Sequence, residues 1–157
     1  MAKLYFRYGT VGSAKTLNLL AVAHNYRSQE KKVLLIKPKI DDRFGQEQIK
    51  SRAGLEMNAD ILVDENTKLL KHNWDGISCI LVDEAQFLSA VHIEELRQLT
   101  VAENIPVICY GLRTDFRARL FEGSLRLMEL ADRIEEVKAT CHYCHSKSIM
   151  NLRHVNG

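Results

Sequence analysis

The segment Gly9 to Thr16, which reads GTVGSAKT, has the residue types and nearly the spacing of a phosphate-binding loop. It departs from the pattern G-x-x-x-x-G-K-[ST] at one position, because Ala14 stands where the second glycine belongs. In such loops, backbone N–H groups and a helix N-terminus bind the phosphates, and the lysine and hydroxyl reach the outer phosphates and Mg²⁺. We therefore predict a nucleoside triphosphate site built from Gly9, Thr10, Val11, Gly12, Ser13, Ala14, Lys15 and Thr16.

A second chemical segment, Asp83-Glu84-Ala85-Gln86, directly follows the continuous apolar run 77–82. Side chains alternate between the two faces of an extended strand, so the two carboxylates are expected to have different roles. One would hold Mg²⁺ together with Thr16, and the other would face a nucleophile as general base or water-positioning group. The alternative is that the acidic pair only ends a strand and the glycines only make a turn. Both motifs together, in this order, favour nucleotide binding.

A basic segment follows the apolar run that ends at Tyr110 and Gly111. Cations after the carboxyl end of a strand can stabilise phosphate, although a basic loop is also a common solvated surface. Phe116, amid these polar residues, is expected either to stack on a base or to anchor its own loop. The three cations in question are Arg113, Arg117 and Arg119.

A C-x-x-C pair, Cys141 and Cys144, lies near the end of the sequence. It supplies half of the four ligands that a structural zinc site needs, and no second C-x-x-C follows before Gly157. Zinc is favoured over a redox pair, because the motif does not open a helix after a strand. Nearby candidate ligands are His142, His145 and His154.

Hydrophobic periodicity predicts the elements that must position these residues. Strands are expected at 3–8, 33–36, 61–63, 77–82, 106–110 and 134–137, and helices at 15–29, 67–72, 91–103 and 124–131. Ser89 is the expected N-cap of the third helix. Leu17, Leu20, Ala21 and His24 recur at helical spacing in the first helix, and Val91, Leu96 and Leu99 are expected to face inward in the third.

The polar stretch 38–58 has no sustained period, so we expect no regular element there and interpret it as either mobile or functional. The alternation of strands and helices elsewhere predicts an α/β fold with a mostly parallel sheet. Its ligands are expected at the carboxyl ends of the strands.

Length and composition set limits on the class of protein. A chain of 157 residues with 46% hydrophobic residues can bury one core with a small appendage. A net charge of +2 gives no electrostatic reason to expect nucleic acid or membrane partners. The sequence shows no membrane span and no signal peptide, so a cytoplasmic location is expected. Cys79 and Cys109 lie in apolar runs and are expected to be buried thiols.

Taken together, these motifs resemble the type II thymidine kinases, cytosolic deoxynucleoside kinases with a RecA-like core, over nearly all of residues 3–157. The resemblance implies a kinase core at 1–138 and part of a zinc-binding and substrate-covering domain at 139–157. It rests on residues 8–16, 37–38 with 41–45, 51–55, 83–88, 111–117 and 141–144.

The resemblance implies in-line transfer of a phosphoryl group from ATP to the 5′-hydroxyl of thymidine, with deoxyuridine as an alternative acceptor. Glu84 falls on the family's general base, and the stretch Asp83, Glu84, Ala85 and Gln86 is assigned to ATP binding with the loop. The implied magnesium contacts are Thr16, Asp83 and Asp41, and the implied substrate contacts are Val11, Arg43, Leu112 and Phe116. The family also implies a homotetramer, inhibition by thymidine triphosphate, and structural Zn²⁺ held in part by Cys141 and Cys144.

Two departures from the family pattern bear on activity. Ala14 replaces a glycine where the backbone approaches phosphate closely, so ATP affinity is expected to be reduced. Family members also carry a second cysteine pair and a substrate-covering segment beyond the region that corresponds to Gly157. One alternative is therefore a non-catalytic nucleotide-binding module. A nucleic-acid motor fragment is a further alternative, which the short chain and modest charge disfavour.

Overall fold

The computed structural model describes residues 1–10, 14–39, 48–50 and 56–138 of the chain. Its order along the chain is β1 (Leu4–Tyr8), α1 (Lys15–Ser28), β2 (Lys32–Pro38), β3 (Gln48–Lys50), β4 (Glu56–Asn58), β5 (Ile61–Val63), the 3₁₀ turn η1 (Leu69–Lys71), β6 (Ile77–Val82), the 3₁₀ turn η2 (Ala85–Phe87), α2 (Ala90–Ala102), β7 (Val107–Gly111), α3 (Glu122–Leu130) and β8 (Arg133–Glu136).

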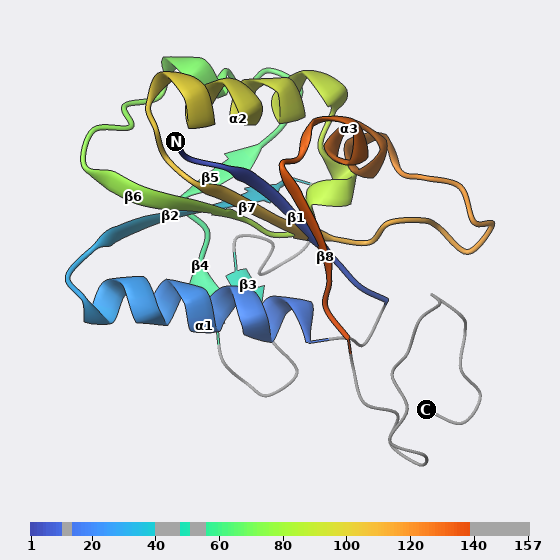
Figure 1. The fold of residues 1–157 in the computed structure, drawn as a ribbon, viewed down its shortest axis with the longest axis horizontal. Helices are drawn as coiled ribbons and strands as arrows, with labels where there is room; N and C mark the ends of the chain where they lie inside the picture. The colour runs from blue at the N-terminus through green and yellow to red at the C-terminus, as the bar shows by residue number, and fades with distance from the viewer. Residues whose placement is uncertain (11–13, 40–47, 51–55, 139–157) are drawn as a thin grey trace, which may run out of the picture.

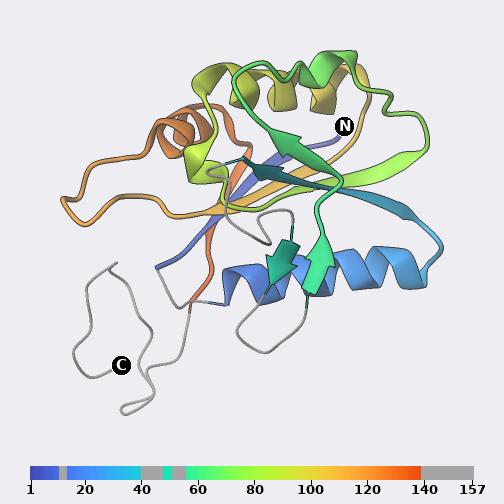
Figure 2. The same ribbon diagram turned by 180° about the vertical axis from the view of Figure 1, so that it is seen from behind.

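Six of the strands form one sheet in the order β5-β2-β6-β7-β1-β8, and every neighbouring pair in it is parallel. Helix α1 covers one face of this sheet, and α2 and α3 cover the other (Figure 1; Figure 2 gives the view from behind). Parallel strands need crossover connections, and helices on both faces bury both sides of the sheet. The predicted α/β class with a parallel sheet is confirmed.

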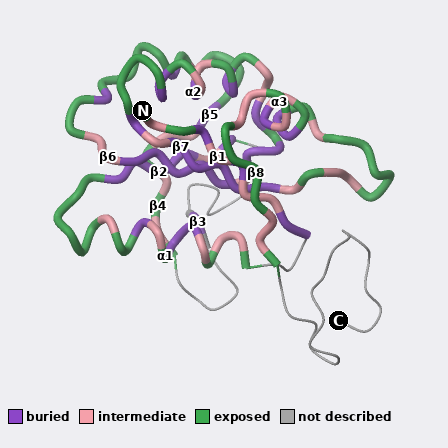
Figure 3. The backbone as a smooth tube through the Cα atoms, in the orientation of Figure 1, coloured by how far each residue is buried: buried purple, intermediate pink, exposed green. Residues whose placement is uncertain are grey.

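Alternating side chains of the central strands supply two separate cores. On β2, Leu34 and Ile36 face the cluster under α2 and α3, whereas Val33 and Leu35 face the cluster under α1. Strand β7 is buried along its whole length, and β2 and β6 are buried along most of theirs (Figure 3). The continuous apolar sequence Ile77–Val82 forms the predicted strand, and its last four residues are buried.

Of the residues at helical spacing in α1, only Leu20 lies on its buried face. Leu19, Leu20 and Ala23 are buried, whereas Leu17, Ala21 and His24 are exposed. Apolar residues occur on several sides of this helix, so their spacing alone does not identify the face that meets the sheet.

Helix α2 shows a smaller error of the same kind, because Val91 is exposed and His92 is buried in the first turn. His92 is satisfied there by its ring contacts, 3.0 Å from Ser89 Oγ through Nδ1 and 3.0 Å from the Thr67 carbonyl through Nε2. Leu96 and Leu99 face inward as predicted.

The stretch 38–58 contains structure that periodicity did not predict. Strands β3 and β4 pair antiparallel, and Ile49 at the centre of β3 is buried in the cluster under α1. Three-residue strands are too short to give a detectable alternation, which explains the error. The expected helix at 67–72 is the single 3₁₀ turn η1.

No helix in the described ranges has the length and apolar character that crossing a bilayer requires. The longest, α1, has 14 residues, against the roughly 20 that a span needs. The described core runs to residue 138, where the predicted appendage begins. Cys141 and Cys144 therefore lie outside the described residues, and the appendage remains a prediction.

Ser89 is the N-cap of α2, as predicted, and its Oγ accepts a hydrogen bond from the backbone N–H of His92 at 3.2 Å. We expect Ser89→Ala to lower the free energy of unfolding by about 1 kcal/mol, because it removes this acceptor. Urea denaturation measures the loss. Ser89→Thr should retain most of the stability, and Ser28→Ala, at an exposed helix end, should change it by less than about 0.5 kcal/mol. Equal losses in Ser89→Ala and Ser28→Ala would contradict the capping role.

Candidate active site

The candidate site lies where three parallel strands end at one edge of the sheet. In the register of β1 and β7, Tyr8 pairs with Gly111, and in that of β6 and β7, Val82 pairs with Cys109. The backbone N–H of Gly9 continues the β1–β7 pairing by donating to the Gly111 carbonyl at 3.2 Å. The carboxyl ends of parallel strands therefore bring the loop after β1, the acidic segment after β6 and the segment after β7 together.

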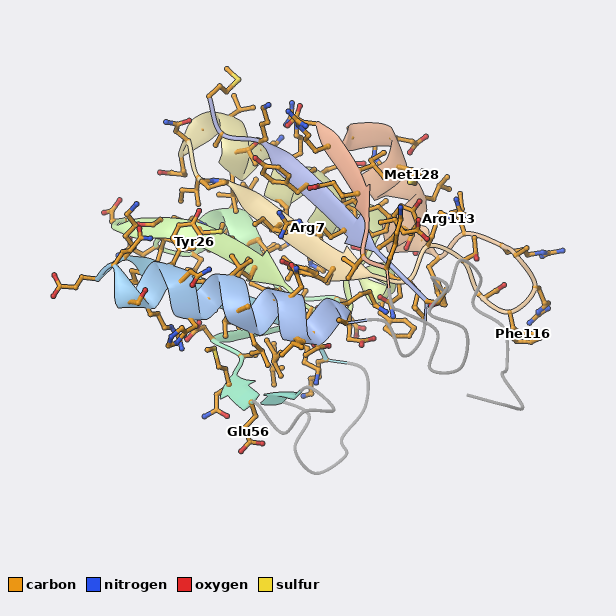
Figure 4. All side chains as sticks on the ribbon, turned by 60° about the horizontal axis from the view of Figure 1, so that its bottom comes forward. Arg7, Tyr26, Glu56, Arg113, Phe116 and Met128 are labelled. Carbon is orange, nitrogen blue, oxygen red and sulfur yellow. The ribbon has the colours of Figure 1, made fainter. Side chains whose placement is uncertain are left out.

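The first turn of α1 is fixed to the sheet beneath it by a polar cluster. Nη1 of Arg7 donates to Asn18 Oδ1 at 3.0 Å and to the Tyr110 hydroxyl at 2.9 Å, and that hydroxyl donates to Asn18 Oδ1 at 2.7 Å. Burial raises the pKa of Tyr110 to about 12, so the hydroxyl keeps its proton. Arg7 is labelled on the strand layer behind α1 in Figure 4. The cluster fixes the helix that follows the candidate phosphate loop.

The described parts of the phosphate loop have the features of an anion site. Lys15 Nζ donates to the carbonyl of Thr10 at 2.7 Å, so the lysine side chain folds back toward the end of β1. Thr10 is buried, and its Oγ1 has no hydrogen-bond partner among the described residues. Helix α1 begins after Ala14, which provides no side-chain cap, and a helix N-terminus is a common binding site for anions.

The conformation of Ala14 is one that any residue can adopt, because its φ is −85° and its ψ is 34°. Backbone strain therefore gives no reason to require glycine at this position. Only the expected closeness of a phosphate to the methyl group remains as an argument for reduced affinity. Val11, Gly12 and Ser13, predicted for the same site, lie outside the described residues.

Asp83 is buried and Lys15 is half-buried at this edge, and burial disfavours the charged form of both side chains. Burial raises the pKa of Asp83 to about 6, and the neighbouring Glu84 charge adds to the shift. Lys37, the backbone N–H of Glu84 and Lys15 oppose it. Burial lowers the pKa of Lys15, against the attraction of Glu84 and Asp83. The two carboxylates and the lysine therefore interact electrostatically.

The carboxylates of Asp83 and Glu84 have different environments, as expected. The cause is a turn after β6 and not the alternation of side chains along a strand. Strand β6 ends at Val82, and Glu84 has the left-handed conformation, with φ 54° and ψ 39°. Asp83 is 6% exposed, whereas Glu84 is half-buried. A non-glycine residue in this region costs of order 1 kcal/mol or more and is often found at functional sites. Asp83 thus faces the interior and Glu84 the accessible edge.

Gln86 connects the acidic segment to the end of β7. Its Nε2 donates to Glu84 Oε2 at 2.8 Å, and its Oε1 accepts from the backbone N–H of Leu112 at 3.2 Å. Gly111 leaves room for this side chain, because a Cβ there would stand 2.5 Å from Gln86 Oε1.

The helix that follows fixes the same segment from its other side. A Cβ on Gly123, in the first turn of α3, would collide with the Ala85 carbonyl, and Ser124 Oγ donates to the Leu112 carbonyl. The sequence motifs do not predict Gly123 or Ser124 as site residues, and Lys37 occurs only within the family pattern at 37–38. Glycine directly after a strand or within a helix's first turn is the signal that points to such close contacts.

The basic segment after β7 forms a small loop with its own contacts. The Asp115 carboxylate accepts from the backbone N–H groups of Arg117 and Arg119, at 2.8 and 3.1 Å. Phe116 is 83% exposed at the outer end of this loop, away from the sheet edge (Figure 4), with the Arg117 guanidinium 5.2 Å from its ring centre. Phe116, one of the predicted substrate residues, therefore does not anchor the loop, and it projects away from the sheet edge.

The neighbouring Arg113 lies closer to the strands than Phe116 does. Its guanidinium is 5.3 Å from the centre of the Tyr8 ring, at the end of β1 (Figure 4). The described structure brings together Gly9, Thr10, Lys15, Asp83, Glu84, Gln86 and Leu112. Asp41, Arg43, Cys141 and Cys144, predicted for magnesium, substrate and zinc, lie outside the described residues.

The described residues include no cluster of three or more His, Cys, Asp or Glu side chains that could hold a metal. Mg²⁺ in nucleotide sites is commonly bound by one or two protein oxygens together with substrate phosphates. The buried carboxylate of Asp83 and the hydroxyl of Thr16 are donors of this kind, and a cation would offset the cost of burying Asp83. The residues present fit a magnesium–nucleotide complex.

Comparison with known proteins gives one consistent result. The family model described as thymidine kinase matches residues 2–157. A thymidine kinase of Lactiplantibacillus plantarum is 43% identical over 100% of this chain and 83% of its own length. One of Chromobacterium violaceum is 44% identical over 98% of this chain and 82% of its own.

Among solved structures, the Pif1 helicase of Candida albicans is similar with a TM-score of 0.48 and 10% identity. That similarity covers 87% of this chain and 36% of the helicase chain. A likeness of this size carries no functional inference, so the fold class rests on the parallel sheet itself.

The raised pKa of Asp83 predicts a pH-dependent stability. Because the folded state holds this proton more tightly than the unfolded state, whose pKa is near 3.8, stability is lost as pH rises from about 4 to about 6. The Asp83→Asn variant has no carboxyl group at this position, so it does not lose this stability. Relative to that of the original chain, its free energy of unfolding should therefore rise by on the order of 3 kcal/mol between pH 4 and pH 7.5. Urea denaturation in EDTA without nucleotide measures both proteins. Asp75→Asn, at an exposed turn, is the control, and parallel pH profiles for Asp83→Asn and the original chain would contradict the prediction.

Proposed function

The chain belongs to the thymidine kinase family, and we propose that the sheet edge described above transfers the γ-phosphoryl group of ATP to the 5′-hydroxyl of thymidine. Membership in the family makes the protein a nucleoside kinase, a phosphotransferase that uses ATP. The proposed mechanism rests on one observation: Lys15, at the end of the phosphate loop, is close enough to Asp83 and Glu84 to interact with both charges. The product would be thymidine monophosphate, with deoxyuridine as an alternative acceptor.

In this proposal the phosphate loop and Lys15 bind the phosphates of ATP. The N-terminus of α1 and the hydrogen bond that holds the Lys15 side chain near Thr10 support this assignment. Asp83 and Thr16 would hold Mg²⁺, with Asp41 as a further proposed contact, and the bound metal would neutralise charge on the outer phosphates. Asp83, which burial isolates from solvent, is suited to holding a cation and poorly suited to meeting a nucleoside.

Glu84 is the proposed general base. Its carboxylate is half-buried at the accessible edge, and Gln86 holds one of its oxygens. In-line attack requires the nucleoside hydroxyl to approach the γ-phosphorus while its proton passes to a carboxylate on the same side. Glu84 would accept that proton, and Lys15 would counter the charge that develops on the phosphoryl oxygens.

The nucleoside is proposed to bind beside the end of β7. Leu112 begins the segment after that strand and lies next to Gln86. Val11, Arg43 and Phe116 are the other proposed contacts, carried from the family pattern. Phe116 stands in the solvent, so it would contact thymidine only after a movement of its loop.

Further properties are proposals carried by the family pattern. They are a structural Zn²⁺ held partly by Cys141 and Cys144, a homotetramer, inhibition by thymidine triphosphate and a cytoplasmic location. The C-x-x-C spacing supports the zinc proposal. The alternative of a non-catalytic binding module is not favoured, because relatives named thymidine kinase match this chain over 98–100% of its length.

We expect Glu84→Gln to lower kcat for thymidine phosphorylation by about 10²–10⁴-fold, because an amide cannot accept the proton. The dissociation constant of Mg-ATP, measured by calorimetry, should stay within about twofold, since phosphate binding rests on other groups. Glu103→Gln, at the exposed end of α2, should leave both quantities unchanged. Turnover by Glu84→Gln equal to that of the original chain would refute the assignment.

Ala14 offers a test of the phosphate loop itself. We expect Ala14→Gly to lower the dissociation constant of Mg-ATP by up to about tenfold, ~1.4 kcal/mol, by removing a methyl group where phosphate approaches. Glycine is tolerated at an N-cap position, so the helix should not be weakened. Ala21→Gly, on the exposed face of α1, is the control and should lower stability without changing affinity. An unchanged dissociation constant in Ala14→Gly would show that the methyl does not face the phosphates.

A further inference from the structure

We propose that Gln86 is a positioning residue that fixes the Glu84 carboxylate relative to the start of the nucleoside segment at Leu112. The inference rests on the proposed function, in which Glu84 is the base. It gives Gln86 a role different from the contact with ATP that the family pattern assigns to it. The bridge runs from the Glu84 carboxylate through the Gln86 amide to the backbone of Leu112.

The hydrogen bonds determine which way the Gln86 amide points. The backbone N–H of Leu112 can only donate, so the amide oxygen must face it, at 3.2 Å. The amide nitrogen then faces Glu84 Oε2, at 2.8 Å, where an ionised carboxylate can only accept. A flipped amide would set acceptor against acceptor and donor against donor. Each partner thus specifies the same orientation.

The surroundings hold Gln86 in this place. The side chain is 3% exposed, so no water competes freely for its amide. It occupies space that only glycine at position 111 leaves open, since a Cβ there would stand 2.5 Å from Oε1. The backbone of η2 is enclosed by the end of β7 on one side and the first turn of α3 on the other. Gln86 is therefore the rigid member of the bridge.

Among the described contacts of the Glu84 side chain, the hydrogen bond from Gln86 has a defined direction, whereas Lys15 acts on it through its charge. The residue is half-buried at the accessible edge, and its carboxylate ends a flexible side chain. A base displaced by about 1 Å from the reacting hydroxyl can lose on the order of 10²-fold in rate. The donor from Gln86 restricts the carboxylate to one side of the turn. The same amide ties that position to the peptide from which the nucleoside segment departs.

Two substitutions separate the functions of the amide. Gln86→Glu keeps the length and the acceptor for Leu112, but replaces the donor toward Glu84 with a carboxylate oxygen. Gln86→Met keeps the length and removes both hydrogen bonds. Gln98→Met, on the exposed face of α2, is the control for a glutamine-to-methionine change. All are made in the full chain, with kcat and KM for thymidine and the dissociation constant of Mg-ATP measured for each.

The positioning role predicts that kcat falls by about 10–100-fold in both Gln86 variants, while the Mg-ATP dissociation constant stays within about twofold. The Gln98→Met control should match the original chain. If Gln86→Met turned over thymidine like the original chain, the bridge would be irrelevant and the inference overturned. If Gln86→Glu retained activity while Gln86→Met lost it, the contact with Glu84 would not matter and the inference would also be overturned. A changed Mg-ATP dissociation constant with unchanged kcat would instead mean contact with ATP, and would also overturn the inference.

A readout that needs no turnover separates this inference from the proposed function. Amide hydrogen exchange at Leu112, followed by NMR, should accelerate at least about tenfold in Gln86→Met and remain slow in Gln86→Glu. The Gln86 side-chain NH₂ resonances should shift in Glu84→Ala, which removes their acceptor. Failure of the original chain to phosphorylate thymidine would refute the proposed function, whereas unchanged NMR signals in these variants would refute the bridge alone.

Discussion

Parallel pairing of β1, β6 and β7 is the constraint on which the rest of the structure depends. Because these strands run in one direction and in fixed register, Gly9, Asp83 and Gly111 come to the same edge of the sheet. Residues more than seventy positions apart along the sequence are thereby brought within reach of one substrate. Helix α1 adds its N-terminus to this edge, and the Arg7, Asn18 and Tyr110 cluster fixes it there. The pairing of these strands therefore determines which residues form the candidate site.

Charged side chains at this edge of the sheet are partly or fully buried, and burial disfavours their charged forms. Asp83 is nearly inaccessible, Lys15 is partly desolvated, and Glu84 occupies a left-handed turn that most residues avoid. Each of these features costs stability, and the cores on the two faces of the sheet must offset that cost. A bound magnesium–nucleotide complex would relieve part of it by supplying opposite charges to both Asp83 and Lys15. Stability and ligand binding are therefore coupled at this edge.

Some parts of this arrangement can be predicted from sequence because the signal is local. The continuous apolar run of β6, the Ser89 cap and the strand-loop-helix context of the phosphate loop all depend on nearby residues. The buried face of α1 does not follow from residue spacing because apolar residues lie on several of its sides, and β3 and β4 are too short to show a period. The left-handed turn at Glu84 and the contact between Gly111 and Gln86 depend on tertiary packing. No spacing within the sequence encodes that packing, so only the structure identifies the bridge to Leu112.

The place of β1 in the sheet also bears on how the chain folds as it is made. Both partners of β1 in the sheet, β7 and β8, lie at residues 107–136, so β1 has no neighbour until those residues have been synthesised. At synthesis rates of about 5–20 residues per second, the interval between β1 and the end of β7 is roughly 5–20 s. Strands β2, β5 and β6 can pair well before that, leaving one side of β6 exposed until β7 emerges. Strand β1 and the residues that follow it are thus synthesised well before β7, the strand that completes this edge of the sheet beside them.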